Sequence, residues 1–211
     1  DAVMFGLANP MHGSGSSMAA NLTWPQPHGY TTDLAKAKQL LAEAGYANGF
    51  ETTLSFDLGS AVVNEPLCVL LQESLAQVGI KTTINKVPGA NWRAELLKKD
   101  MPLISNFFSG WLDYPEYFFF WCYHGQNAVF NTMSYQSPAM DALIDGARTA
   151  AAAGDKAGYA KEVKGFIDMA FEDVPRVPLF QPYLNIAMQK SVTGYRYWFH
   201  RQLDYRTLAK A

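Results

Sequence analysis

The hydrophobic positions along the chain recur with two periods, one typical of helices and one typical of strands. The helical period, with capping residues and glycine stops at several ends, predicts helices over 33–45, 64–78, 91–99, 115–123, 137–150 and 155–173. Alternation of apolar and polar residues predicts strands over 50–58, 80–87, 101–108 and 183–189, with shorter ones at 2–7 and near 180. Thr31 and Thr32 precede the first helix and are expected to supply its N-cap.

Strands and helices alternate along this pattern, and the connections that contain helices are long enough for parallel crossovers. The sequence therefore predicts an α/β fold with a mixed sheet flanked by helices. Residues 1–30 lack periodicity and are punctuated by glycine and proline, which is typical of an extended connection over a surface.

Composition excludes several classes of protein. The 211 residues are 49% hydrophobic and carry a net charge of −2, so the chain shows no basic footprint for nucleic acid. No segment approaches the roughly 20 apolar residues that span a bilayer. Cys68 and Cys122 stand among apolar residues without metal-ligand spacing, so both are expected to be buried free thiols, and we expect no cofactor.

One stretch, residues 106–123, concentrates aromatic side chains around a turn-like Gly-Trp-Leu-Asp-Tyr-Pro step. Such a run has two interpretations. Its aromatic residues can be core, as a strand, a turn and the start of a buried helix. They can also form the walls of a small-molecule pocket in which one carboxylate, Asp113, fixes the orientation of the ligand.

Enzyme motifs are absent from the sequence. No His-Glu-x-x-His, Cys-x-x-Cys or Gly-x-Ser-x-Gly motif occurs, which argues against zinc and serine-hydrolase chemistry. Asp113 and Glu116 could act as an acid/base pair, so a hydrolase stays open as an alternative. Glu116 is otherwise expected in the first turn of the helix that begins at Pro115.

Five segments in order resemble the family 5 extracellular solute-binding proteins, the dipeptide- and oligopeptide-binding receptors of bacterial ABC importers. The helix Tyr-Thr-Thr-Asp-Leu-Ala-Lys-Ala-Lys-Gln-Leu-Leu-Ala-Glu-Ala-Gly-Tyr resembles the family's most recognisable element. The matching segments are residues 30–46, 71–81, 110–115, 131–144 and 174–179. Together they extend over nearly the whole chain.

The resemblance implies one lobe of a type II-like periplasmic-binding-protein fold, the C-terminal lobe, which closes with a missing N-terminal lobe over the ligand. Residues 1–30 would be a hinge-side segment, 31–190 the α/β lobe, and 191–211 a tail returning toward the hinge or the missing lobe. The implied partners are a peptide or other small-molecule ligand and the membrane permease subunits of an ABC transporter. The implied location is the periplasm, or the outer cell surface as a lipoprotein.

The resemblance also implies site residues. In peptide-binding members the Asp after Gly-Trp pairs with the ligand's α-ammonium, which gives this role to Asp113. Trp111 would form a ligand-facing wall, with Phe108, Tyr114 and Tyr117 as further wall residues. This chain has one residue between Trp and Asp where peptide binders have two or more, so two alternatives stay open. Asp113 could instead cap the helix at Pro115, and the ligand could be an oligosaccharide.

Two further residues match the family's motif after the aromatic stretch. Asn131 and Tyr135 belong to the matching segment 131–144, and we interpret both as structural.

Overall fold

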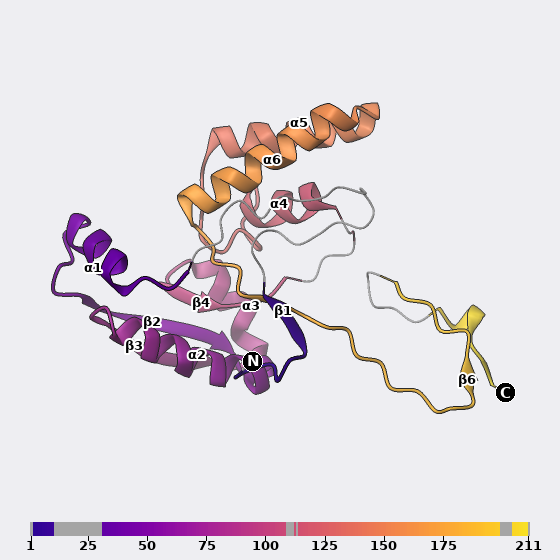
Figure 1. Cartoon of the computed structure of the whole chain (residues 1–211), viewed down its shortest axis with the longest axis horizontal. Helices are drawn as coiled ribbons and strands as arrows, with labels where there is room; N and C mark the ends of the chain where they lie inside the picture. The colour runs from indigo at the N-terminus through magenta and orange to yellow at the C-terminus, as the bar shows by residue number, and fades with distance from the viewer. Residues whose placement is uncertain (1, 11–30, 109–111, 113, 199–203, 211) are drawn as a thin grey trace. The chain divides into compact units, whose positions relative to one another are not determined.

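The computed structural model describes residues 2–10, 31–108, 112, 114–198 and 204–210. These residues form two compact units, each with its own helices and strands (Figure 1). The first unit comprises Asp1–Phe5, Gly29–Phe107 and Ala128–Tyr135. The second comprises Gly6–His28, Phe108–Asn127 and Gln136–Ala211.

The first unit is a three-stranded parallel sheet with helices on both faces. Along the chain it contains α1 (Leu34–Glu43), β2 (Phe50–Asp57), the 3-10 turn η1 (Leu58–Ser60), α2 (Ala61–Ala76), β3 (Ile80–Val87), α3 (Gly89–Lys98) and β4 (Leu103–Ser105). The strand order is β3-β2-β4, with β2 parallel to both neighbours. Each neighbour follows a helical crossover, as expected for parallel pairing.

Alternation along the strands gives each face of this sheet its own core. Leu54 and Phe56 of β2 pack with Cys68 of α2 on one face. On the other face, Val87 at the end of β3 packs with Trp92 and Leu96 of α3. The two-residue period of a strand sends neighbouring side chains to opposite faces, so one strand can serve both helices.

Helices and short antiparallel ladders make up the second unit. The helices are α4 (Pro115–Tyr123), α5 (Pro138–Ala153) and α6 (Lys156–Asp173), and η2 (Tyr205–Thr207) is a 3-10 turn. β1 (Ala8–Pro10) pairs with β5 (Phe180–Pro182), and β6 (Val192–Thr193) pairs with β7 (Ala209–Lys210). The core of this unit comes from α4, α5 and α6, and its fully buried members are Phe119, Cys122, Met140, Ile144, Ala147, Val163 and Phe166.

The predicted α/β class, with a sheet flanked by helices, is confirmed, and all six predicted helices are present. Four local predictions were wrong. Residues 2–6 form turns instead of a strand, residues 183–189 adopt no regular structure, and the strand expected at 101–108 is reduced to β4. The N-cap of α1 is Asp33, whose side chain accepts a hydrogen bond from the backbone N–H of Lys36 at 2.9 Å, so neither threonine caps this helix.

Candidate functional site

The aromatic stretch falls mainly in the second unit, and the structure describes only part of the predicted site. Trp111 and Asp113 lie outside the described residues. Phe108 and Tyr117 lie together, with ring centroids 6.3 Å apart, and the Phe118 ring is 5.4 Å from that of Phe108. Tyr114 is 42% exposed and forms the N-cap of α4, where its carbonyl accepts from the N–H groups of Tyr117 and Phe118.

Helix α4 divides its aromatic side chains between core and partly exposed positions. Phe119 is buried and stacks on Phe166 of α6 with ring centroids 4.1 Å apart, and it also stacks on Tyr123 at 4.5 Å. Tyr117 and Trp121 are half-buried and contact each other edge-to-face, with centroids 6.4 Å apart. The core interpretation therefore holds for Phe119 and Tyr123, and the wall interpretation of the half-buried residues stays a prediction.

Glu116 lies in the first turn of α4, as predicted, and accepts a hydrogen bond from the phenol of Tyr159 on α6. Burial, together with this bond and the negative charge of Glu116, raises the pKa of Tyr159 well above its usual range. Glu116 thus serves as an acceptor between two helices, which leaves it poorly placed for the acid/base role that a hydrolase would require.

Cys122 and Cys68 are buried free thiols, as predicted. Burial raises the pKa of the Cys122 thiol to about 11, although the Arg176 guanidinium lowers it in part. Since the thiolate is the reactive form of cysteine, Cys122 is unsuited to be a nucleophile near neutral pH. The Arg176 guanidinium also lies over the rings of Phe118 and Tyr123, at 5.7 and 5.9 Å from their centroids.

Asn131 and Tyr135 form a closed turn in the first unit, which confirms their structural interpretation. The Asn131 amide donates to the Tyr135 carbonyl at 2.8 Å and accepts from the Tyr135 N–H at 2.9 Å. The Lys99 ammonium donates to the carbonyls of Ala128 and Asn131, which fastens this turn to the end of α3. Partial burial lowers the pKa of Lys99.

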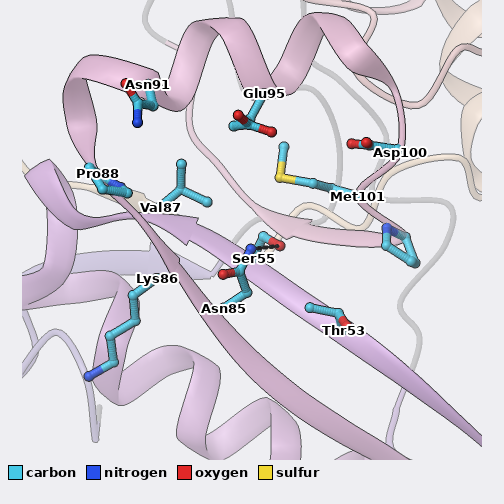
Figure 2. A pocket seen from close by; sticks show the side chains of 11 residues that line it. Thr53, Ser55, Asn85, Lys86, Val87, Pro88, Asn91, Glu95, Asp100 and Met101 are labelled. Carbon is cyan, nitrogen blue, oxygen red and sulfur yellow. Dashed lines mark hydrogen bonds between the residues drawn. The ribbon is translucent and has the colours of Figure 1, made fainter.

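A pocket of about 440 Å³ lies in the first unit, and none of its lining residues belongs to the aromatic stretch. It opens on the face of the sheet that carries α3 (Figure 2). Thr53 and Ser55 of β2 and Asn85 of β3 form its floor, and the Asn85 amide donates to the Ser55 hydroxyl at 3.2 Å. Glu95 and Asp100 contribute carboxylates to its wall.

These pocket residues were not predicted from the sequence. A signal was present in the alternation itself: Thr53 and Ser55 are polar at positions two apart on one strand, as are Thr83 and Asn85 on another. Polar residues repeated on one face of a mostly buried strand indicate that the face is not fully covered. Only the register, which sets Ser55 opposite Asn85, shows that the two polar pairs are neighbours.

Two features are absent from the described part of the chain. It holds no group of three or more His, Cys, Asp or Glu side chains that could bind a metal ion. It also holds no helix that combines the length and the apolar character needed to cross a membrane.

Comparison with known proteins places these features in context. Residues 1–130 match the family described as bacterial extracellular solute-binding proteins, family 5 Middle. The glutathione-binding protein GsiB of Pectobacterium atrosepticum is 30% identical over 176 residues, which cover 80% of this chain and 34% of that protein. The chain thus spans about a third of the length of the curated relatives it matches.

Solved structures resemble the fold at lower sequence identity. The periplasmic binding protein DppA of Helicobacter pylori, in complex with the peptide STSA, superposes with a TM-score of 0.78 at 24% identity, over 97% of this chain and 40% of that one. The oligopeptide-binding protein AppA of Bacillus subtilis, in complex with a nonapeptide, gives 0.75 at 23% identity, over 99% of this chain and 44% of that one. The described fold is therefore part of a periplasmic-binding-protein fold.

Proposed function

This chain belongs to the bacterial extracellular solute-binding proteins of family 5, and we propose that it provides part of the solute receptor of an ABC import system. The receptor binds a peptide or another amine-bearing organic solute by closure of two lobes. The family is one of non-enzymatic solute-binding proteins, so the function is binding and release without chemical conversion. The family resemblance seen in the sequence is confirmed by the match over residues 1–130.

The partly exposed aromatic group of Phe108, Tyr117 and Trp121 is the observation that supports this proposal best. Aromatic faces at the edge of a core offer broad apolar contact to a ligand without a large entropic cost. In sequence, this group flanks Trp111 and Asp113, the residues that correspond to the family's ligand-contacting motif. We assign Trp111, Phe108, Tyr114 and Tyr117 to the wall of the solute site.

Asp113 is proposed as the group that recognises the solute's ammonium. Relatives are named for glutathione or were solved with peptides, and a peptide with a free amino terminus carries such a charge. A carboxylate and an ammonium form a charge-assisted hydrogen bond, which is roughly twice as strong as a neutral one. A solute without an ammonium would leave the carboxylate unpaired and would bind less well.

We propose roles for the remaining parts of the chain from its resemblance to the family. Residues 31–190 are proposed as the C-terminal lobe, 1–30 as its hinge-side segment and 191–211 as a tail that returns toward the hinge or the other lobe. The portion of the relatives that this chain does not span would supply the opposing half of the site. Periplasmic location and delivery to permease subunits complete the proposal, supported by the relative described as an ABC transporter-associated periplasmic binding protein.

The test measures peptide affinity of the full-length protein by calorimetry, for a free peptide and for its N-acetylated form. Asp113→Asn is expected to weaken the affinity for the free peptide by more than about tenfold, or roughly 1.4 kcal/mol, and to leave the affinity for the acetylated peptide unchanged. Glu73→Gln, the same chemical change at an exposed position on α2, serves as the matched control.

Equal affinity of wild type and Asp113→Asn for the free peptide would refute the ammonium-recognition role. Tight binding of neutral oligosaccharides, with none of peptides, would favour the sugar-receptor alternative, since sugars also stack on aromatic rings. Turnover of any bound solute would favour the hydrolase alternative.

A further inference from the structure

The pocket in the first unit exists because α3 covers only part of its face of the sheet. The helix buries Trp92 and Leu96, which pack against Val87 of β3. At ten residues it extends only about 15 Å. Thr53 and Ser55 of β2 lie on the same face, in the part of the sheet where the pocket opens.

The floor of this pocket contains a buried hydroxyl that is bonded to an exposed amide. Ser55 is fully buried, and its oxygen accepts from the amide of Asn85 at 3.2 Å. Ser55 lines the pocket beside Asn85, whose side chain is exposed (Figure 2). With its amino group directed to Ser55, Asn85 retains a carbonyl oxygen that can accept from the ligand.

The wall of the pocket is acidic. Glu95 projects from α3, and Asp100 follows the helix (Figure 2). Lys86 also lines the pocket, but its ammonium pairs with Glu65 of α2, which covers the other face of the sheet. Lys98 bonds one oxygen of Glu95 at 2.7 Å from an exposed position. The charge of Lys98 balances only one of the two carboxylates, so the pocket favours a positively charged ligand over an anion.

We propose that this pocket binds a small polyhydroxylated organic cation, such as an amino sugar or an amino alcohol. Its ammonium would pair with Glu95 and Asp100, and one hydroxyl would donate to the carbonyl oxygen of Asn85. Met101, which also lines the pocket, offers an apolar contact to the carbon skeleton. The volume of about 440 Å³ lies within the range of small-molecule sites. This site is separate in residues from the aromatic stretch and does not depend on Asp113.

The experiment uses the ¹⁵N-labelled 211-residue chain, with D-glucosamine and D-glucose as matched probes that differ in one ammonium. Below the pKa of its ammonium, glucosamine is expected to shift the side-chain amide resonances of Asn85 and Asn91 in a saturable manner. Glucose should bind at least about tenfold more weakly. The double variant Glu95→Gln, Asp100→Asn should bind glucosamine no more tightly than glucose. Glu51→Gln, which alters an exposed carboxylate paired with Lys81, should change nothing.

Several outcomes would overturn the proposal: no saturable shift at either amide, equal affinities for the two probes, or undiminished binding by the double variant. The dispersion of the variant's spectrum shows directly whether it is folded. Asp113→Asn should leave the glucosamine shifts unchanged, so the pocket and the peptide site can succeed or fail separately.

Discussion

At the scale of single residues, the bond between Tyr159 and Glu116 shows how a functional-looking carboxylate can serve the core. Tyr159 is only 8% exposed, and its phenol reaches the first turn of α4. A buried phenol needs a partner, and an ionised carboxylate is the strongest acceptor available. The pair therefore ties the start of the aromatic helix α4 to α6.

Tyr159→Phe is expected to lower the free energy of unfolding by about 1.5 kcal/mol or more near neutral pH, because it removes a hydrogen bond to a charged group. The pKa of Tyr159 is raised in the folded state, so its contribution is fully present below the unfolded pKa of about 10. It is lost as pH rises above that value toward the raised folded pKa. The difference between wild type and variant in urea denaturation should therefore shrink above about pH 10.

Tyr205→Phe provides the matched control, because Tyr205 is 74% exposed. It should leave the unfolding free energy unchanged across the same pH range. A Tyr159→Phe difference that stays constant with pH would contradict the titration, and no difference at any pH would contradict the bond itself.

Residue-scale predictions from the sequence succeeded where the role depends on near neighbours in the chain. Asn131 and Tyr135 are four residues apart, and Glu116 takes its position from Pro115. The pocket was missed because Ser55 and Asn85 are thirty residues apart and meet only through strand register. Trp111 and Asp113 lie outside the described residues, so their assignment stays a prediction.

At the scale of elements, the helices could be predicted because periodicity, caps and glycine stops all agree. Ser137, for example, stands at the start of the helix predicted over 137–150 and caps α5, where its hydroxyl accepts from the Met140 N–H at 3.3 Å. The strand expected at 183–189 fails for a reason that the sequence does not contain. Alternation makes a segment suitable for a sheet, but a strand also needs a partner for its backbone groups. Among the described residues, the register with β1 extends only from Phe180 to Pro182, and one further backbone bond, from the Tyr183 N–H to the Leu7 carbonyl, follows it.

The parallel pairing of β2 and β3 begins at two glycines that approach each other closely. Gly49 has a φ of +72°, and a Cβ built on it would lie 1.9 Å from the carbonyl oxygen of Gly79. Gly49→Ala should force the two backbones apart at the first pair of the ladder, Phe50 opposite Ile80. Gly45, with a φ of +88°, has no atom within 4 Å of its Cβ position, so Gly45→Ala isolates the cost of the backbone conformation.

We expect Gly45→Ala to cost about 1–2 kcal/mol and Gly49→Ala at least about 2 kcal/mol more, measured by urea denaturation. The direction of the difference follows from the steric clash alone, since both positions share a positive φ. Equal losses for the two variants would show that the strand starts can separate without penalty.

At the scale of the whole molecule, apolar surface is distributed unevenly. None of the residues of α1 is buried, although the helix has an apolar face that includes Leu40. Every residue from Gln181 to Lys190 is exposed, including Leu184, Ile186 and Met188. Contiguous exposed apolar residues of this kind mark interaction surfaces. Because the chain spans about a third of its curated relatives, these surfaces are consistent with the proposal that an opposing part of the receptor completes the fold.

This distribution predicts an early cleavage site in the described parts of the 211-residue chain. Chymotrypsin should cleave at Tyr183 and Leu184, on an exposed segment without regular structure, at least about tenfold faster than at Phe119 or Phe166. The latter are buried in helices, so their cleavage requires opening of the core of the second unit. Mass spectrometry of the early fragments identifies the site.

Tyr183→Ser with Leu184→Ser should abolish the early cut there, whereas Tyr205→Ser should leave it in place. Initial cleavage inside α4 or α6 would contradict the prediction, because it would mean that the protease reaches these helices before it reaches the exposed segment.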